Sequence, residues 1–435
     1  MDHSYGTRLK DRVKEEEARA RSEAKQKAAN VKVVPRLRPI AYDVSDVDHS
    51  APLELIAALE VNGEQFYFTG ELIPLNRRGF KYKPCRAQPN FKANVFATTE
   101  VEPTQARFSY SDRAQAMQLN ASATQCTVDE GWRLVRANVG IREGTYYFEF
   151  NIVRANRGQG HVRVGIARKE ANLEAPVGFD GYSYGIRDVS GELMTLLRPQ
   201  GQLVEEGFGD GDVIGFLVEF PSLKDHRQAV DQFIQSVGGK ALLNKRRKKG
   251  PETSGFTEFG NIVRDQVPIK FKNELYFEQF EYTASDLMNH LLNPVTVFGE
   301  KAVIEQELQL RLLSNLPRIA GSKITIFKNG TAVGEPLENV YSFLPTSVEN
   351  DQVGYNAVQA QNNNYRNTDD GTLGYYPMAL CFKGGVVELN AGPDFQYPVE
   401  GARPLSERFD DQVISEWYWD LVDEVEAEYL DSFFE

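Results

Sequence analysis

Gly140-Ile-Arg-Glu-Gly-Thr-Tyr-Tyr-Phe-Glu-Phe150 is the stretch that decides the fold of this chain. Tyr146 to Phe150 is a short aromatic run that follows a glycine, which is typical of a β-strand. Ile214-Gly-Phe-Leu-Val-Glu-Phe220 has the same character. Between Trp132 and Phe220 the other apolar runs are also short and separated by glycine, so the sequence predicts a mainly β domain of strands joined by turns.

Further strands are expected downstream. Lys323-Ile-Thr-Ile-Phe-Lys-Asn-Gly330 ends in an Asn-Gly pair, which favours a hairpin because both residues tolerate positive φ. Met378 to Phe382 and Gly385 to Asn390 supply the last strands. Residues 221–322 are interpreted as an insertion with structure of its own, because loops of that length are rare without it. Its apolar residues between Gly299 and Asn315 predict a helix that ends before Pro317.

Composition limits the possible classes of protein. A chain of 435 residues can form one large domain with insertions or two domains. Its 3 cysteines are odd in number and widely spaced, which favours buried thiols over a disulfide framework or a zinc cluster. The chain has no apolar run long enough for a membrane span and no secretory signal pattern, so we expect an intracellular protein without membrane contact.

Charge is unevenly distributed over the chain. The net charge is −13, yet residues 1–40 hold 11 Lys and Arg against 6 Asp and Glu. Lys245, Arg246, Arg247, Lys248 and Lys249 form a run of consecutive cations, whereas residues 410–435 carry 10 acids and no base. Residues 347–374 are rich in Asn and Gln and are interpreted as a second insertion. These segments predict basic appendages and an acidic tail.

The landmark motifs of the region resemble a known family. They are the opening stretch, His161-Val-Arg-Val-Gly165, Ala175-Pro-Val-Gly-Phe-Asp180, Ser183-Tyr-Gly-Ile-Arg187 and Gly211-Asp-Val-Ile-Gly215. In this order they resemble a SPRY domain, and more narrowly the absent-small-homeotic type of SPRY subunit of the COMPASS histone H3 lysine-four methyltransferase complex, in its shortened budding-yeast form. The resemblance implies an antiparallel β-sandwich of the SPRY (B30.2-like) type, with large loop insertions and a C-terminal amphipathic helix.

Arg163 and Arg187 are the first candidate binding residues. Two arginines on strands can simply face solvent, but planar guanidinium groups also present fixed donors to carboxylates. The resemblance implies that these arginines and Pro176 bind an acidic, aromatic segment of a WD-repeat propeller subunit. The two tyrosines that the family uses beside them are replaced here by Trp132 and Phe179. An aromatic face is retained, whereas the phenol hydroxyls are lost.

The tail is the second candidate binding site. At helical spacing a broad apolar stripe is formed by Ile414, Trp417, Tyr418, Leu421, Val422, Val425 and Tyr429. Such a stripe can pack a terminal helix on its own domain. Alternatively, the resemblance implies that it lies in the groove of a dumpy-30-type dimer, with Asp420-Leu-Val-Asp-Glu-Val-Glu-Ala-Glu-Tyr429 as the matching motif. Deletion of residues 410–435 would then abolish binding of that dimer without unfolding the sandwich.

Basic segments are candidate DNA contacts. Arg36, Arg38 and the cations at 245–249 could neutralise nucleosomal DNA phosphates. They could equally form a solvated loop or a nuclear localisation signal, and the resemblance places the chain in the nucleus. The five histidines have no metal-ligand spacing, and no catalytic motif is found. We therefore expect no catalytic residue, no metal and no cofactor.

These observations divide the chain into a basic arm and linker (1–40), a lead-in segment (41–131), a SPRY domain (132–400) with insertions at 221–322 and 347–374, and an acidic dumpy-30-binding helix (405–435). The implied function is that of a noncatalytic subunit that helps a SET-domain catalytic subunit and other COMPASS subunits to methylate nucleosomes. Two other classes remain open, namely a SPRY substrate receptor of a ubiquitin ligase and a sandwich-fold sugar-binding protein or hydrolase.

Overall fold

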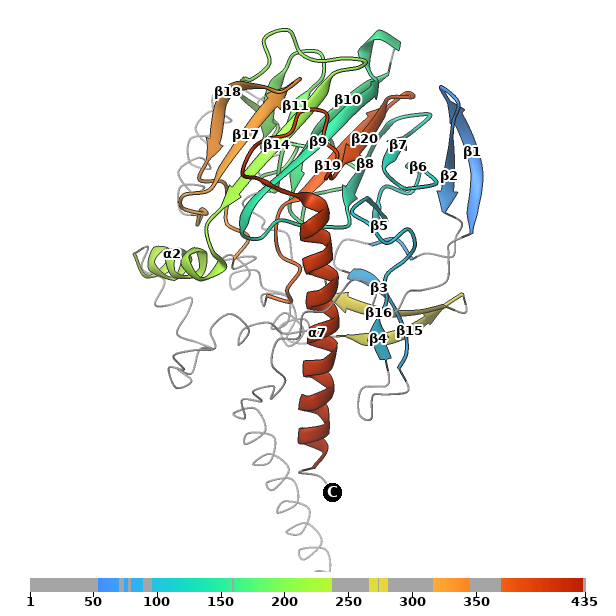
Figure 1. The fold of residues 1–435 in the computed structure, drawn as a ribbon, viewed down its shortest axis with the longest axis vertical. Helices are drawn as coiled ribbons and strands as arrows, with labels where there is room; N and C mark the ends of the chain where they lie inside the picture. Colours follow the sequence, from blue (N-terminus) through green and yellow to red (C-terminus); the bar gives the residue numbers. More distant parts are fainter. Residues whose placement is uncertain are drawn as a thin grey trace, which may run out of the picture.

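The structure is a computed structural model of the whole chain. It describes residues 54–69, 74–76, 80–88, 96–158, 160–236, 266–272, 274–280, 316–344 and 369–432. Within these ranges two large antiparallel sheets are stacked as a sandwich, and a smaller sheet and a long helix lie below them (Figure 1). The predicted mainly β fold with a C-terminal helix is therefore confirmed.

The first large sheet has ten strands and contains the opening stretch of the sequence as β9. In spatial order its strands are β1 (Leu55–Val61), β2 (Glu64–Thr69), β6 (Gln118–Asn120), β7 (Gln125–Thr127), β20 (Val386–Asn390), β9 (Gly144–Arg154), β14 (Val213–Phe220), β17 (Lys323–Lys328) and β18 (Thr331–Glu338). Short β21 (Arg403–Pro404) pairs with β9 in parallel. Asn329 and Gly330 join β17 to β18 with φ of 49° and 80°, as the hairpin signal predicted.

The second large sheet has seven strands and carries the candidate arginines. In spatial order its strands are β13 (Arg198–Gln202), β12 (Glu192–Thr195), β11 (Ser183–Arg187), β10 (His161–Ala167), β19 (Tyr376–Phe382), β8 (Trp132–Ala137) and β5 (Phe108–Arg113). Strands β5, β6 and β7 precede residue 132 yet pair within the two large sheets. The lead-in segment thus contributes to the sandwich.

Side chains along β9 point alternately to the two faces of its sheet, and this alternation explains which residues fill the core of the sandwich. Phe148 stacks on Phe216 of β14 at 5.3 Å between ring centroids, inside the core. Glu149 points to the opposite face and is buried, accepting hydrogen bonds from the backbone N–H groups of Gln396 and Tyr397 at 2.9 and 2.8 Å. The segment after β20 therefore covers the outer face of the ten-stranded sheet and leads the chain into the helix.

A third, four-stranded sheet joins the lead-in segment to the first insertion. Its order is β15 (Val267–Phe271), β16 (Glu274–Phe280), β3 (Phe80–Ala87) and β4 (Phe96–Thr98). The insertion also begins with helix α2 (Leu223–Ser236), which follows β14 directly. A 3-10 turn, η2 (Asn156–Gly158), links β9 to β10. The helix expected between Gly299 and Asn315 and most of the second insertion lie outside the described residues.

Helix α7 (Leu405–Asp431) begins at the base of the sandwich and extends beside the four-stranded sheet (Figure 1). Leu405, Phe409 and Val413 belong to the main hydrophobic core, which fixes the first half of the helix to the sandwich. The division into domains at residues 40, 131 and 400 stays a prediction.

Candidate partner-binding surfaces

Arg163 and Arg187 lie directly opposite each other on neighbouring strands. In the antiparallel register of β10 and β11, Arg163 pairs with Arg187 and Gly165 pairs with Gly185. Opposed residues of an antiparallel pair point to the same face of a sheet, so both guanidinium side chains emerge on one face. The structure therefore brings together two arginines that are separated by a long loop in the sequence.

The two arginines differ in their surroundings. Arg163 is only 9% exposed, and its Nη1 donates to the carbonyl oxygen of Val177 at 2.7 Å. Burial, and then the charge of Arg187, lowers the pKa of Arg163 to about 10. The side chain of Arg187 is 39% exposed, and its Nη1 contacts Glu192 Oε2 at 2.9 Å. Arg163 is thus a desolvated cation beside a more accessible one.

A row of aromatic rings runs beside the arginines on the same face. Trp132 of β8 pairs with Phe382 of β19, which pairs with His161 of β10. Trp132 stacks on Phe382 at 4.2 Å between ring centroids and remains 37% exposed. His161 precedes Arg163 by two residues, so alternation along β10 puts the imidazole and the guanidinium on one face. The rings form a flat apolar area next to positive charge.

The loop between β10 and β11 carries Pro176 and Phe179, and both side chains are half-buried. Two glycines explain the close approach of this loop to the sheet. A Cβ on Gly178, whose φ is +79°, would lie 2.3 Å from the carbonyl oxygen of Met194, and a Cβ on Gly185 would lie 2.8 Å from Val177. The loop therefore lies against the strand that ends in Arg187.

These residues define the arginine–aromatic surface: Trp132, His161, Arg163, Pro176, Phe179, Arg187 and Phe382. His161 and Phe382 were not among the sequence-based candidates. Strand register is the signal that reveals them, because Phe382 lies between Trp132 and His161 only once β19 is placed between β8 and β10. Chemically, the surface offers guanidinium donors beside exposed rings, which suits an extended segment with carboxylates and apolar side chains.

Helix α7 turns a different face to the domain in each half. Its first half uses the apolar residues Leu405, Phe409 and Val413, with Trp417 packed against the same core. Among the described side chains of its second half, the buried ones are Asp420 and Glu424. Asp420 accepts hydrogen bonds from the backbone N–H of Thr98 at 2.8 Å and from its hydroxyl at 3.2 Å.

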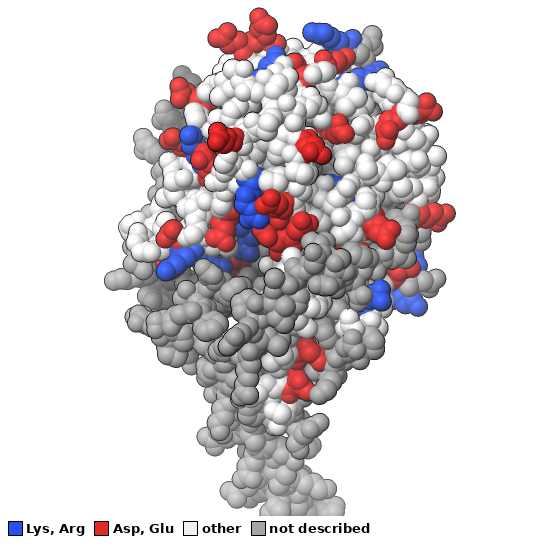
Figure 2. Space-filling view, in the orientation of Figure 1, with Lys and Arg blue, Asp and Glu red and all other residues white. Residues whose placement is uncertain are grey.

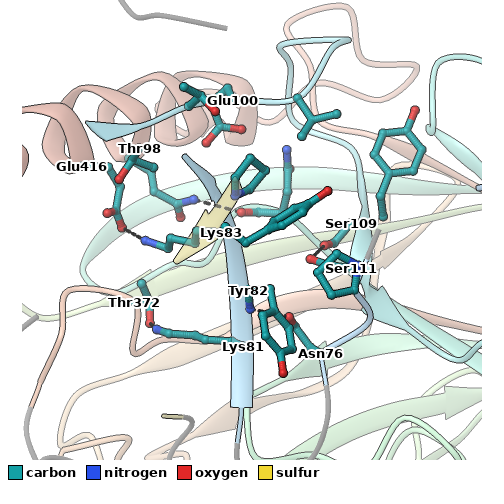
Figure 3. A pocket seen from close by; sticks show the side chains of 18 of the residues that line it. Asn76, Lys81, Tyr82, Lys83, Thr98, Glu100, Ser109, Ser111, Thr372 and Glu416 are labelled. Atoms are coloured by element: carbon teal, nitrogen blue, oxygen red, sulfur yellow. Dashed lines mark hydrogen bonds and ion pairs between the residues drawn. The ribbon is translucent and has the colours of Figure 1, made fainter. Parts of the chain in front are cut away.

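An ion pair between Lys83 of β3 and Glu416 reinforces this contact beside a cavity of about 130 Å³ (Figure 3). The same cavity is lined by Thr98 and Glu100, and burial raises the pKa of Glu100. Asp420 also raises the pKa of Cys85, which reaches about 12 mainly because of burial. The acidic side of α7 therefore faces the four-stranded sheet.

The predicted apolar stripe is consequently turned away from this contact in the second half of the helix. Val425 is 37% and Tyr429 39% exposed. Leu421 and Val422 are half-buried, as are Ile414, Trp417 and Tyr418 nearer the sandwich. Of the two interpretations of the tail, packing on its own domain describes the first half, whereas the second half keeps apolar side chains at the surface.

The candidate DNA contacts at Arg36, Arg38 and 245–249 lie outside the described residues. On the face shown in Figure 2, basic and acidic side chains of the described residues are interspersed, and most of the described surface is uncharged. In the described ranges no group of three or more His, Cys, Asp and Glu could hold a metal ion. None of the described helices combines the length and the apolarity that a membrane span requires.

Comparison with known proteins identifies the family. No protein-family model matches the chain. The COMPASS component cclA of Colletotrichum higginsianum is 33% identical over 416 residues, which cover 85% of this chain and 70% of that protein. The Set1 complex component ash2 of Schizosaccharomyces pombe is 31% identical, with 93% of this chain and 54% of that protein covered.

The COMPASS component BRE2 of Saccharomyces cerevisiae is 26% identical over 84% of this chain and 90% of its own length. Among solved structures, the SPRY domain of human HERC1 covers 66% of this chain and 99% of that domain at 13% identity, with a TM-score of 0.31. Since the match to the Colletotrichum protein exceeds 30% identity over more than two thirds of that relative, the chain belongs to the family of Ash2-type components of COMPASS (Set1) complexes.

Proposed function

We propose that this chain is a noncatalytic scaffold and activator subunit of a COMPASS complex that methylates histone H3 at lysine four in the nucleus. Its arginine–aromatic surface binds an acidic, aromatic segment of the WD-repeat propeller subunit. The second half of α7 binds a dumpy-30-type dimer. The SET-domain subunit carries the chemistry and S-adenosylmethionine, while this chain and its partners stabilise its active arrangement on the nucleosome.

The opposed arginines are the observation that carries the proposal. Arg163 is desolvated, and among the described residues no carboxylate forms an ion pair with it. A bound carboxylate would neutralise this buried charge, and the flat rings of Trp132 and Phe382 would cover apolar side chains beside it. An acidic segment with aromatic residues therefore fits the surface better than a neutral or basic one.

The surface of helix α7 supports the proposed binding of a dumpy-30-type dimer. Because Asp420 and Glu424 occupy the buried side of the helix, Leu421, Val422 and Val425 are left for another apolar surface. Helix-in-groove binding uses anchors at this spacing, with acidic residues at the rim.

A variant of Arg187 tests the proposal directly. Arg187→Ala removes the accessible guanidinium without opening the core, so the sandwich should fold normally while binding of the purified WD-repeat subunit falls about tenfold or more. Arg403→Ala is the matched control, since Arg403 lies on β21 of the other sheet and has a comparably exposed side chain in an ion pair with Glu407 of α7. Co-elution on size-exclusion chromatography that is equal for both variants would contradict the assignment.

A further inference from the structure

A carboxylate of the same chain, Glu192, lies at the edge of the arginine–aromatic surface. Glu192 is the first residue of β12, the strand next to β11. Its Oε2 lies 2.9 Å from Arg187 Nη1 and also accepts a hydrogen bond from the hydroxyl of Ser190 at 2.9 Å. The side chain of Glu192 is 31% exposed, so the ion pair stands at the edge of the surface where a partner would approach.

Two carboxylates act on the two guanidinium groups: Glu192 pairs with Arg187, and the charges of Asp188 and Glu192 both act on Arg163 without an ion pair. Like charges directly opposite each other on paired strands repel. In the described part of the chain, Glu192 forms an ion pair with Arg187, and neither it nor another carboxylate does so with Arg163. Glu192 therefore offsets the charge of Arg187 by direct contact, whereas Arg163 is compensated only at longer range by Asp188 and Glu192.

We propose that Glu192 is an internal competitor for the acidic partner segment and sets the affinity and charge selectivity of the surface. The inference rests on the proposed function of this surface. A partner carboxylate that reaches Arg187 must either displace Glu192 or share the guanidinium with it, and two carboxylates side by side repel. A partner segment with a single acidic residue gains little binding energy when it replaces Glu192 at Arg187. A segment with several acidic residues can bind Arg163 and Arg187 together.

Glu192→Gln tests this role because glutamine keeps the shape and the hydrogen bond to Ser190 while removing the charge. The probe is a short synthetic peptide that alternates glutamate with tyrosine, titrated by fluorescence anisotropy against the full chain. We expect Glu192→Gln to bind the probe about threefold more tightly than the wild type at low salt. The gain should shrink as salt is added, since the ion pair is close to solvent.

Two further variants keep the outcomes distinct. Arg187→Ala combined with Glu192→Gln should show no gain over Arg187→Ala alone, because the competition acts through Arg187. Glu206→Gln, at an exposed acid on the loop before β14, controls for the change in net charge. Equal or weaker binding by Glu192→Gln would overturn the competitor role and indicate that Glu192 orients Arg187 instead. Unchanged binding by Arg187→Ala would overturn the proposed function itself.

Discussion

Buried polar residues around the sandwich are held in fixed charge states by their neighbours. Arg136 donates from Nε and Nη2 to the two carboxylate oxygens of Asp112, both at 2.8 Å, and the pair is buried. Arg136 and Asp112 are thus buried as a charged pair, whereas His226 of α2 is buried as a neutral side chain. Its Nε2 lies 2.7 Å from Ser342 Oγ, and burial followed by the charges of Arg168 and Arg227 lowers its pKa from 6.5 to about 3.

His226 should make stability depend on pH. Its pKa is lower in the folded chain than in the unfolded one, so the unfolded chain binds more protons between these values. The free energy of unfolding should therefore decrease as the pH falls from about 6.5 towards about 3. His226→Gln should remove part of this decrease, up to a few kcal/mol, in urea titrations across the range.

The difference in the free energy of unfolding between the wild type and His226→Gln should change over this pH range. A constant difference would contradict the buried neutral state of His226.

The elements could be predicted to very different degrees. Strands β9, β14, β17, β19 and β20 are confirmed where aromatic and β-branched runs indicated them, because strand formation there depends on local pattern and turn residues. The beginning of α7 at Leu405 also agrees with the sequence. What the helix contacts could not be predicted. Thr98 and Asp420 are 322 residues apart, and no local pattern reveals such a pair.

The stripe on α7 can be tested at the element scale. Leu421→Asp combined with Val425→Asp places charges on the outward apolar side, so binding of a dumpy-30-type dimer should fall at least about tenfold because buried charges are costly. The sandwich should keep its melting temperature within a few degrees. Ser415→Asp also adds a charge at an exposed position of the same helix, but before the Asp420–Tyr429 motif, and should bind normally. Full affinity of the double variant in a calorimetric titration would show that the stripe is not the contact.

At the scale of the whole molecule, two candidate surfaces lie on different parts of one chain. The arginine–aromatic surface belongs to the seven-stranded sheet, whereas the apolar stripe lies on the half of α7 that extends away from the sandwich (Figure 1). Sequence motifs indicated both surfaces, and the register of β8, β19, β10 and β11 assembles the first one. Phe382 could be assigned to it only from the strand order, which is a long-range property, whereas Glu192 meets Arg187 across the short β11–β12 hairpin.

A truncation of α7 should abolish binding of the dumpy-30-type dimer and leave binding of the WD-repeat subunit intact, provided that the core residues of the helix are kept. Deletion from residue 410 would remove Val413, which is 2% exposed, and should destabilise the sandwich by about 1–3 kcal/mol. Ending the chain after Asp420 keeps Leu405, Phe409, Val413 and Trp417, together with the contacts of Glu416 and Asp420. This shorter chain should still bind the WD-repeat subunit but lose the dumpy-30-type dimer in a pull-down with purified proteins. Retention of the dimer would show that α7 beyond Asp420 is dispensable for it.

We infer that guanidinium groups and aromatic rings on one face of the seven-stranded sheet hold an acidic segment of the WD-repeat subunit. The decisive experiment is a calorimetric titration of that subunit with the wild-type chain and with the Arg187→Ala/Trp132→Ala double variant, each at low and high salt. The double variant should bind at least about a hundredfold more weakly and show a smaller salt dependence than the wild type. Equal affinity and equal salt dependence of the two proteins would contradict it.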